Sequence, residues 1–189
     1  MELWYSENHS EDVKFSIRVD KQLYTGKTDY QRIDVMTSKE FGTFLTLDGL
    51  MMVAEKDEFI YHEMITHVPM FGPGEGLFTR EFYGNCSKAL NENGIFVNQH
   101  ESPYYDNYAN SLVRAHSRIK GVFPIHKLYQ AHIPTYPSGH WLFGFASNKF
   151  DPLKDLDADK WNKLGIKTEY YNTDLHKGSF ALPNYVKEL

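Results

Sequence analysis

The hydrophobic pattern of this chain changes its period near residue 55, and this change constrains the fold more than any other feature. Before it, residues 13–19 alternate apolar and polar side chains, as half-buried strands do, and residues 31–36 and 43–47 continue the pattern. The Asp48-Gly49 pair between two apolar runs is typical of a tight hairpin turn. We therefore predict a small antiparallel β domain over residues 1–54.

From residue 55 onward the pattern predicts an α/β domain over residues 55–189. Residues 55–68 favour a helix, with acidic residues in its first turn and Pro69 at its end. Further helices are predicted over about 77–91 and 108–120, a short buried strand over 95–97, and paired strands over 127–133 and 141–147. This order of elements is that of the C-terminal portion of a doubly wound α/β sheet. The tail beyond residue 147 is predicted to be irregular.

Charge and composition exclude several classes of protein. The formal net charge is −5 and 41% of the residues are hydrophobic, which favours a folded core and disfavours a basic nucleic-acid surface. Mild acidity suits a cationic ligand. The single Cys86 cannot form an internal disulfide, and neither a signal peptide nor a membrane span is evident. We expect a cytoplasmic protein without nucleic-acid or membrane partners, in which Cys86 is a structural thiol.

A loop with two prolines is the most specific local feature. Pro134 and Pro137 bracket Thr135 and Tyr136, and each proline fixes its own φ and restricts the residue before it. Ser138-Gly139 then favours a turn. The loop is predicted to be stiff and to hold Tyr136 in one direction, with Trp141 close behind.

Together with four other motifs, this loop resembles the spermidine synthases. The motifs follow in the family's order: Glu2-Leu3-Trp4-Tyr5, Asp29-Tyr30-Gln31, Leu47-Asp48-Gly49 and Asp57-Glu58-Phe59-Ile60-Tyr61-His62-Glu63-Met64. These polyamine aminopropyltransferases move an aminopropyl group from decarboxylated S-adenosylmethionine to putrescine, giving spermidine and methylthioadenosine. The resemblance implies a Rossmann-like, methyltransferase-type second domain, no cofactor, and a homodimer or homotetramer.

The resemblance also implies that a central segment is absent. In the family, a helix like residues 58–68 leads into a nucleotide-binding segment with a Gly-rich loop, an acidic residue for the ribose and the catalytic aspartate. Here Phe71 runs directly into Gly72, which resembles the stretch after that segment, and no GxGxxG motif occurs. The Rossmann-like part is therefore expected to be incomplete, with no catalytic residue to assign. Because a buried strand at 95–97 would lack neighbours, we predict aggregation, exchange of elements between protomers, or a missing piece.

The resemblance assigns binding roles residue by residue. It implies that Gln31 and Pro73 bind the donor and methylthioadenosine, and that Tyr61, His62 and Tyr136 bind the polyamine. Trp4 extends the same channel or packs as a core residue, whereas Glu101, which with Gln99 follows a predicted strand, can contact an ammonium group. No metal site is expected, because the spacing of His62 and His67 does not match HExxH.

Two functions from different classes remain open at this stage. One is a spermidine synthase whose chain, as written, is inactive alone because the catalytic aspartate is missing. The other is a catalytically dead scaffold or oligomerisation form of the same family. A third alternative, an unrelated small β-plus-α binding domain, requires all five motif matches to be accidental. The choice among acceptor amines is not determined by the sequence.

Overall fold

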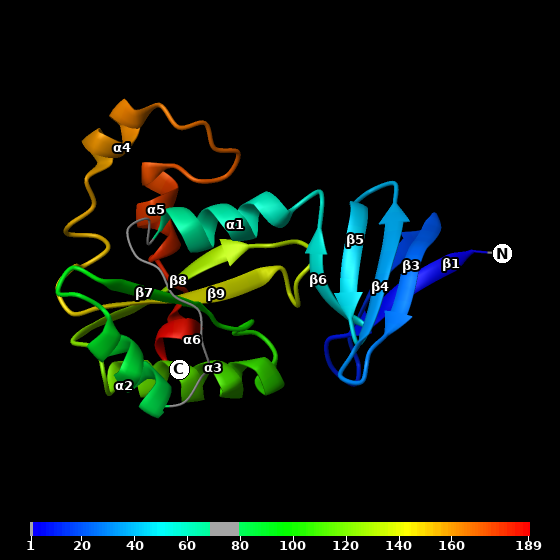
Figure 1. The fold of residues 1–189 in the computed structure, drawn as a ribbon, viewed down its shortest axis with the longest axis horizontal. Coiled ribbons are helices and arrows are strands. Elements are labelled where there is room, and N and C mark those ends of the chain that lie inside the picture. The colour runs from blue at the N-terminus through cyan, green and yellow to red at the C-terminus, as the bar shows by residue number, and fades with distance from the viewer. Residues whose placement is uncertain (1, 69–79) are drawn as a thin grey trace.

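The computed structural model describes residues 2–68 and 80–189. Its N-terminal part consists of antiparallel strands (Figure 1). β1 (Leu3–Asn8) pairs with β2 (Lys14–Val19). The other four strands form a second sheet in chain order: β3 (Lys21–Lys27), β4 (Arg32–Ser38), β5 (Gly42–Leu47) and β6 (Leu50–Ala54). The predicted antiparallel β structure is thus confirmed.

The alternation in the sequence explains the core of this part. Apolar side chains at every second position of the strands meet in one cluster: Tyr5, Ile17, Val19, Met36, Phe44, Met51 and Ala54. The predicted hairpin turn between β5 and β6 is present, with φ of 50° at Asp48 and 82° at Gly49. Positive φ at both positions is what a two-residue hairpin of this twist requires.

The second part is a three-stranded sheet with helices on both faces. Its helices are α1 (Glu58–His67), α2 (Arg80–Ala89) and α3 (Asp106–Lys120). Its strands are β7 (Ile95–Gln99), β8 (Ile125–His132) and β9 (His140–Ser147), in the order β7-β9-β8 with both pairings antiparallel. The mixed α/β class is confirmed, and β7 is an edge strand among the described residues.

Successive side chains of β9 point to opposite faces of this sheet and pack against different helices. Trp141, Phe143 and Phe145 pack with Ile60 and Met64 of α1. On the opposite face, two smaller clusters join β9 to the helices below it in Figure 1: Tyr83, Phe96, Ile119, Phe123 and Ala146 in one, Leu112, Leu142 and Val186 in the other. The sheet is therefore the middle layer of three, with α1 covering one face and α2 and α3 the other.

The tail departs from the sequence prediction. It contains three short helices, α4 (Ala158–Leu164), α5 (Thr173–Ser179) and α6 (Asn184–Lys187), where an irregular segment was expected. The side chains of Asp157 and Asn172 accept hydrogen bonds from the first turns of α4 and α5, so ordinary N-caps start both helices. Glu63 of α1 holds the tail in place by accepting bonds from three consecutive N–H groups, those of residues 169–171.

Neither a helix able to cross a membrane nor a metal-binding group of three or more side chains occurs among residues 2–68 and 80–189. Cys86 is half-buried next to the cluster of Tyr83 and Phe96, and burial raises the pKa of its thiol. These contacts agree with the expected role of Cys86 as a packed, structural thiol.

Candidate polyamine site

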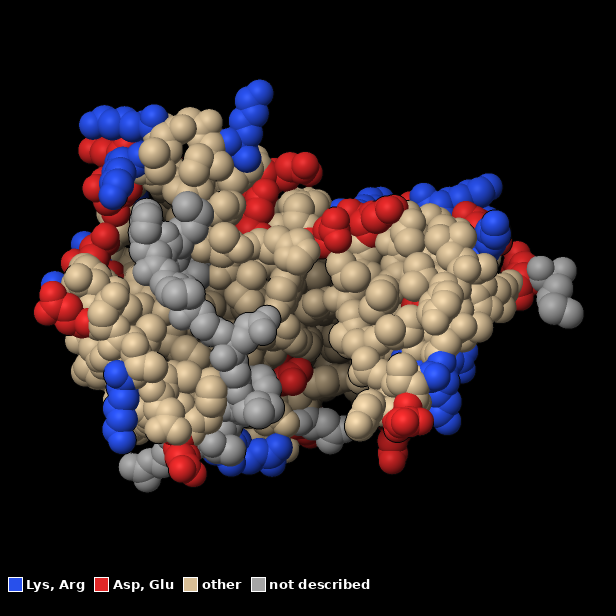
Figure 2. Space-filling view, in the orientation of Figure 1, with Lys and Arg blue, Asp and Glu red and all other residues tan. Residues whose placement is uncertain are grey.

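Three of the residues predicted to bind the polyamine line one pocket. Tyr61 and His62 come from α1 and Tyr136 from the loop between β8 and β9, and the cavity between them measures about 240 Å³. Its remaining walls are Met52, Val53, Ala54, Asp57, Glu58, Gln99 and Ile133. The pocket thus lies where β6 leads into α1 and where β7 and β8 end, and Figure 2 shows the surface hollowed between the two parts of the molecule.

Tyr136 presents its ring to the pocket rather than its hydroxyl. The hydroxyl donates to the carbonyl oxygen of Met52 at 2.9 Å, and burial raises the pKa of this tyrosine. The ring centroid lies 6.1 Å from that of Tyr61 and 4.9 Å from that of Trp141. Trp141 is itself only 4% exposed, so it supports Tyr136 from behind.

The loop that carries Tyr136 is closed by its own backbone. The N–H of Ile133 donates to the carbonyl of Gly139 at 2.9 Å, and the N–H of Gly139 donates to the carbonyl of Tyr136 at 2.8 Å. Ser138 and Gly139 both have positive φ, at 63° and 67°. The turn predicted at Ser138-Gly139 is therefore present, and the stiffness of the loop stays a prediction.

The other residues of the pocket differ in exposure. His62 is exposed at its mouth, with its ring 5.7 Å from that of Tyr61, and burial raises the pKa of Tyr61. Asp57, which the sequence analysis did not single out, is only 4% exposed and accepts two hydrogen bonds from Thr135. Such a pocket offers aromatic surface for a hydrocarbon chain and carboxylates for cationic ends.

The remaining predicted site residues lie elsewhere. Glu101 lines a neighbouring cavity of about 450 Å³ together with Gln99, and burial raises the pKa of Glu101 to about 7. Gln31 is exposed in the turn before β4, and Trp4 is 52% exposed on β1, so neither lines the polyamine pocket. Pro73 lies outside the described residues. The proposed ligand contacts of Gln31, Trp4 and Pro73 stay predictions.

A row of histidines lies beside this second cavity. The ring of His100, which directly follows Gln99, is 6.1 Å from that of His116 on α3, and the ring of His116 is 5.6 Å from that of His126 on β8. Within residues 2–68 and 80–189, neither Nε2 of His100 nor Nδ1 of His116 has a hydrogen-bond partner. Burial, together with the neighbouring histidine, lowers the pKa of His100 to about 3 and that of His116 to about 4.

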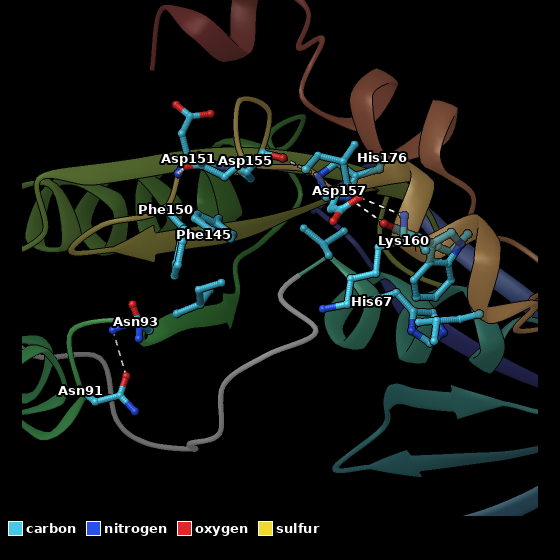
Figure 3. Close-up of a pocket in the computed structure, with 17 residues that line it drawn as sticks. His67, Asn91, Asn93, Phe145, Phe150, Asp151, Asp155, Asp157, Lys160 and His176 are labelled. Carbon is cyan, nitrogen blue, oxygen red and sulfur yellow. Dashed lines mark hydrogen bonds between the residues drawn. The ribbon is translucent and has the colours of Figure 1, made fainter.

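A third cavity is remote from these residues. It measures about 540 Å³ and lies at the start of β7 and the end of β9, with Phe145, Trp161 and three aspartates in its wall (Figure 3). The aspartates hold the local backbone, since Asp155 accepts from the N–H of Asp151 and Asp157 caps α4. None of the predicted site residues that the structure describes lines this cavity, so its size does not mark the site.

Comparison with known families and structures agrees with the sequence prediction. Residues 3–55 match the spermidine synthase tetramerisation domain, and residues 71–157 match the spermine/spermidine synthase domain. The polyamine aminopropyltransferases of Alkaliphilus oremlandii and Clostridium perfringens are each 51% identical over 278 positions, covering 100% of this chain and 98% of theirs.

Two solved structures give the same result. A spermidine synthase in complex with the transition-state analogue AdoDATO superposes with a TM-score of 0.91 at 31% identity, covering 98% of this chain and 94% of the other. The spermidine synthase of Thermotoga maritima superposes with a TM-score of 0.91 at 32% identity, covering 98% and 93%.

The alignments also bear on the predicted gap. They run over 278 positions whereas this chain has 189 residues, so about 89 positions of the alignment have no residue in this chain. The predicted place of the gap, between Phe71 and Gly72, lies outside the described residues and stays a prediction. With both of its domain types matched and relatives aligned along its whole length, this chain belongs to the spermidine synthase family of transferases.

Proposed function

We propose that the pocket between α1 and the proline loop holds the acceptor diamine, putrescine, of an aminopropyl transfer. The observation that carries this proposal is the meeting of Tyr61 and Tyr136, which are 75 positions apart in the chain, on either side of one cavity. The methylene chain of the diamine packs between the two rings, and its cationic ends face the carboxylates of Asp57 and Glu58.

The transfer itself needs groups that this pocket does not supply. A neutral amine of putrescine attacks the carbon next to the sulfonium of decarboxylated S-adenosylmethionine, the carbon–sulfur bond breaks, and methylthioadenosine leaves. Because an alkylamine resembles lysine, with a pKa of about 10.4, a carboxylate must accept the proton. Asp57 is committed to Thr135, and the family's catalytic aspartate has no counterpart in the sequence. We infer that this chain binds diamine and does not turn over alone.

A second candidate function is that of an oligomerisation subunit without catalysis. The match of residues 3–55 to a tetramerisation domain indicates a homo-oligomer, for which we propose a homodimer or homotetramer. Exposed apolar side chains on these strands favour such contacts: Leu3, Trp4, Leu23, Tyr24 and Leu50 are each 48–57% exposed. Donor binding through Gln31 and Pro73, and a cytoplasmic location, belong by family resemblance to the first proposal, that of an aminopropyltransferase.

Titration calorimetry on the purified chain, after its intact mass has been checked against 22.0 kDa, tests the proposal. We expect saturable binding of putrescine, and no methylthioadenosine above background when the sulfonium donor is added. Tyr136→Ala should abolish the binding, whereas Tyr104→Ala, at an exposed tyrosine outside the pocket, should preserve it. Absence of putrescine binding would refute the polyamine proposal, and clear turnover would refute the inferred inactivity.

A further inference from the structure

The two walls of the polyamine pocket are joined by a buried pair, Asp57 and Thr135. Asp57 follows β6 and is 4% exposed, and Thr135 in the proline loop is fully buried. One carboxylate oxygen, Oδ2 of Asp57, accepts from the N–H of Thr135 at 2.9 Å and from its hydroxyl at 2.8 Å. The pair therefore links segments 78 positions apart.

Asp57 makes this link in place of its expected local role. It occupies the N-cap position of α1, where an aspartate ordinarily accepts from the N–H groups of the first turn, but its side chain makes no such bond. A buried carboxylate is costly unless hydrogen-bonded, and both donors of Thr135 supply that compensation. The carboxylate thus stabilises the contact between α1 and the loop rather than the helix end.

Tyr136 directly follows Thr135, so the pair controls the position of its ring. The prolines on either side restrict the backbone of the loop. The hydrogen bonds of Thr135 hold the loop against Asp57. The hydroxyl of Tyr136 donates to the carbonyl of Met52, which lies on the same side of the pocket as Asp57. We propose that Asp57 and Thr135 are positioning residues that set the separation of Tyr136 from Tyr61. They thereby set the width of the pocket and its preference for diamine length, an inference that rests on the proposed polyamine function.

Thr135→Val and Thr135→Ser form the matched test. Valine preserves shape but removes the hydroxyl donor, whereas serine retains it. Calorimetry with putrescine and with cadaverine, which is one methylene longer, gives the ratio of the two dissociation constants. We expect Thr135→Val to weaken putrescine binding roughly tenfold and to reduce the preference between the diamines, because a hydrogen bond to a charged group is lost. Thr135→Ser should stay within about twofold of the wild type.

Near-ultraviolet circular dichroism supplies a readout that needs no ligand. The edge-on contact of Tyr136 with Trp141 places both rings in an asymmetric environment, so displacement of the loop should change their signal. Thr135→Val should change this signal, whereas Thr135→Ser should keep the signal of the wild type. If Thr135→Val does not fold, Thr135→Ala replaces it; this variant also lacks the hydroxyl donor and should show the same changes.

The outcomes separate the two proposals. If the wild type binds no diamine, the proposed function fails, and the dichroism of the variants alone decides the positioning inference. If the wild type binds putrescine but Thr135→Val leaves both the diamine ratio and the aromatic signal unchanged, the positioning inference is wrong while the polyamine site stands. A lower binding stoichiometry with an unchanged ratio would indicate partial unfolding only, and would also count against positioning.

Discussion

Mild acid should destabilise the folded chain through His100. This side chain is 3% exposed, its Nε2 has no hydrogen-bond partner among the described residues, and its pKa is lowered from 6.5 to about 3. Besides burial, His116 lowers the pKa of His100, and His126 and Lys120 lower that of His116, so none of these groups stabilises a proton on either ring. Below pH 6.5 the unfolded chain therefore binds a proton at this position that the folded chain does not.

The magnitude follows from the difference between the two pKa values. Stability from this group is complete above the unfolded pKa of 6.5 and falls as the pH decreases toward about 3. Between pH 6.5 and pH 5, an interval of about 1.5 pH units, the free energy of unfolding falls by about 1.36 kcal/mol for each unit. The total loss is about 2 kcal/mol. For a chain of this size that lowers the melting temperature by about 4–8 °C. His116 acts in the same direction but by less, because it is only partly buried and solvent screens it.

Thermal melts of the wild type and of His100→Gln at pH 7 and pH 5 measure the effect. Glutamine cannot take up the proton, so the fall in melting temperature between the two pH values should be smaller in the variant by about 4–8 °C. His132→Gln, at an exposed histidine outside the row, should behave as the wild type. Equal falls in the wild type and His100→Gln would refute the reasoning, whatever the absolute stability of the variant.

Three further substitutions test the packing around the site. Tyr129→Phe removes a buried hydrogen bond of 3.1 Å to the carbonyl of Met64, and should lower the free energy of unfolding in urea by about 1 kcal/mol. Glu63→Ala removes the acceptor of three backbone N–H groups, and should speed limited proteolysis between residues 165 and 172 while Glu58→Ala does not. Gly144→Ala places a Cβ against Nε2 of His100, and should lower the free energy of unfolding in the same urea assay by about 1–3 kcal/mol. An unchanged urea midpoint would contradict the close approach of His100 to Gly144.

Much of the fold followed from periodicity, because each strand buries one face. The alternation along residues 13–19 predicted β2, and the apolar run at 141–147 predicted β9 and its pairing with β8. The pairing of β9 with β7 was not predicted, because the strand at 95–97 was expected to lack neighbours. The tail helices were missed because they are short. Their caps, Asp157 and Asn172, were visible in the sequence but without a strong helical period behind them.

The site was only partly predictable for a different reason. Tyr61 and Tyr136 were assigned to one pocket by family resemblance, since no local pattern relates residues so far apart. Asp57 was missed because an acidic residue in the first turn of a predicted helix is ordinarily explained by the helix dipole, and its actual partner, Thr135, is far along the chain. Long-range hydrogen bonds of this kind leave no periodic trace in a single sequence.

The central position of β9 has a consequence for how the second part can assemble. Both of its neighbours run antiparallel to it, and β8 reaches it through a loop of only seven residues, 133–139. Such a hairpin forms among near neighbours in the chain, so the closure entropy to be overcome is small. The β8–β9 hairpin can therefore nucleate early and receive β7 afterwards, without any crossover from the N-terminal strands. A folding nucleus of this kind lies wholly after residue 124 and so does not depend on the length of the segment before it.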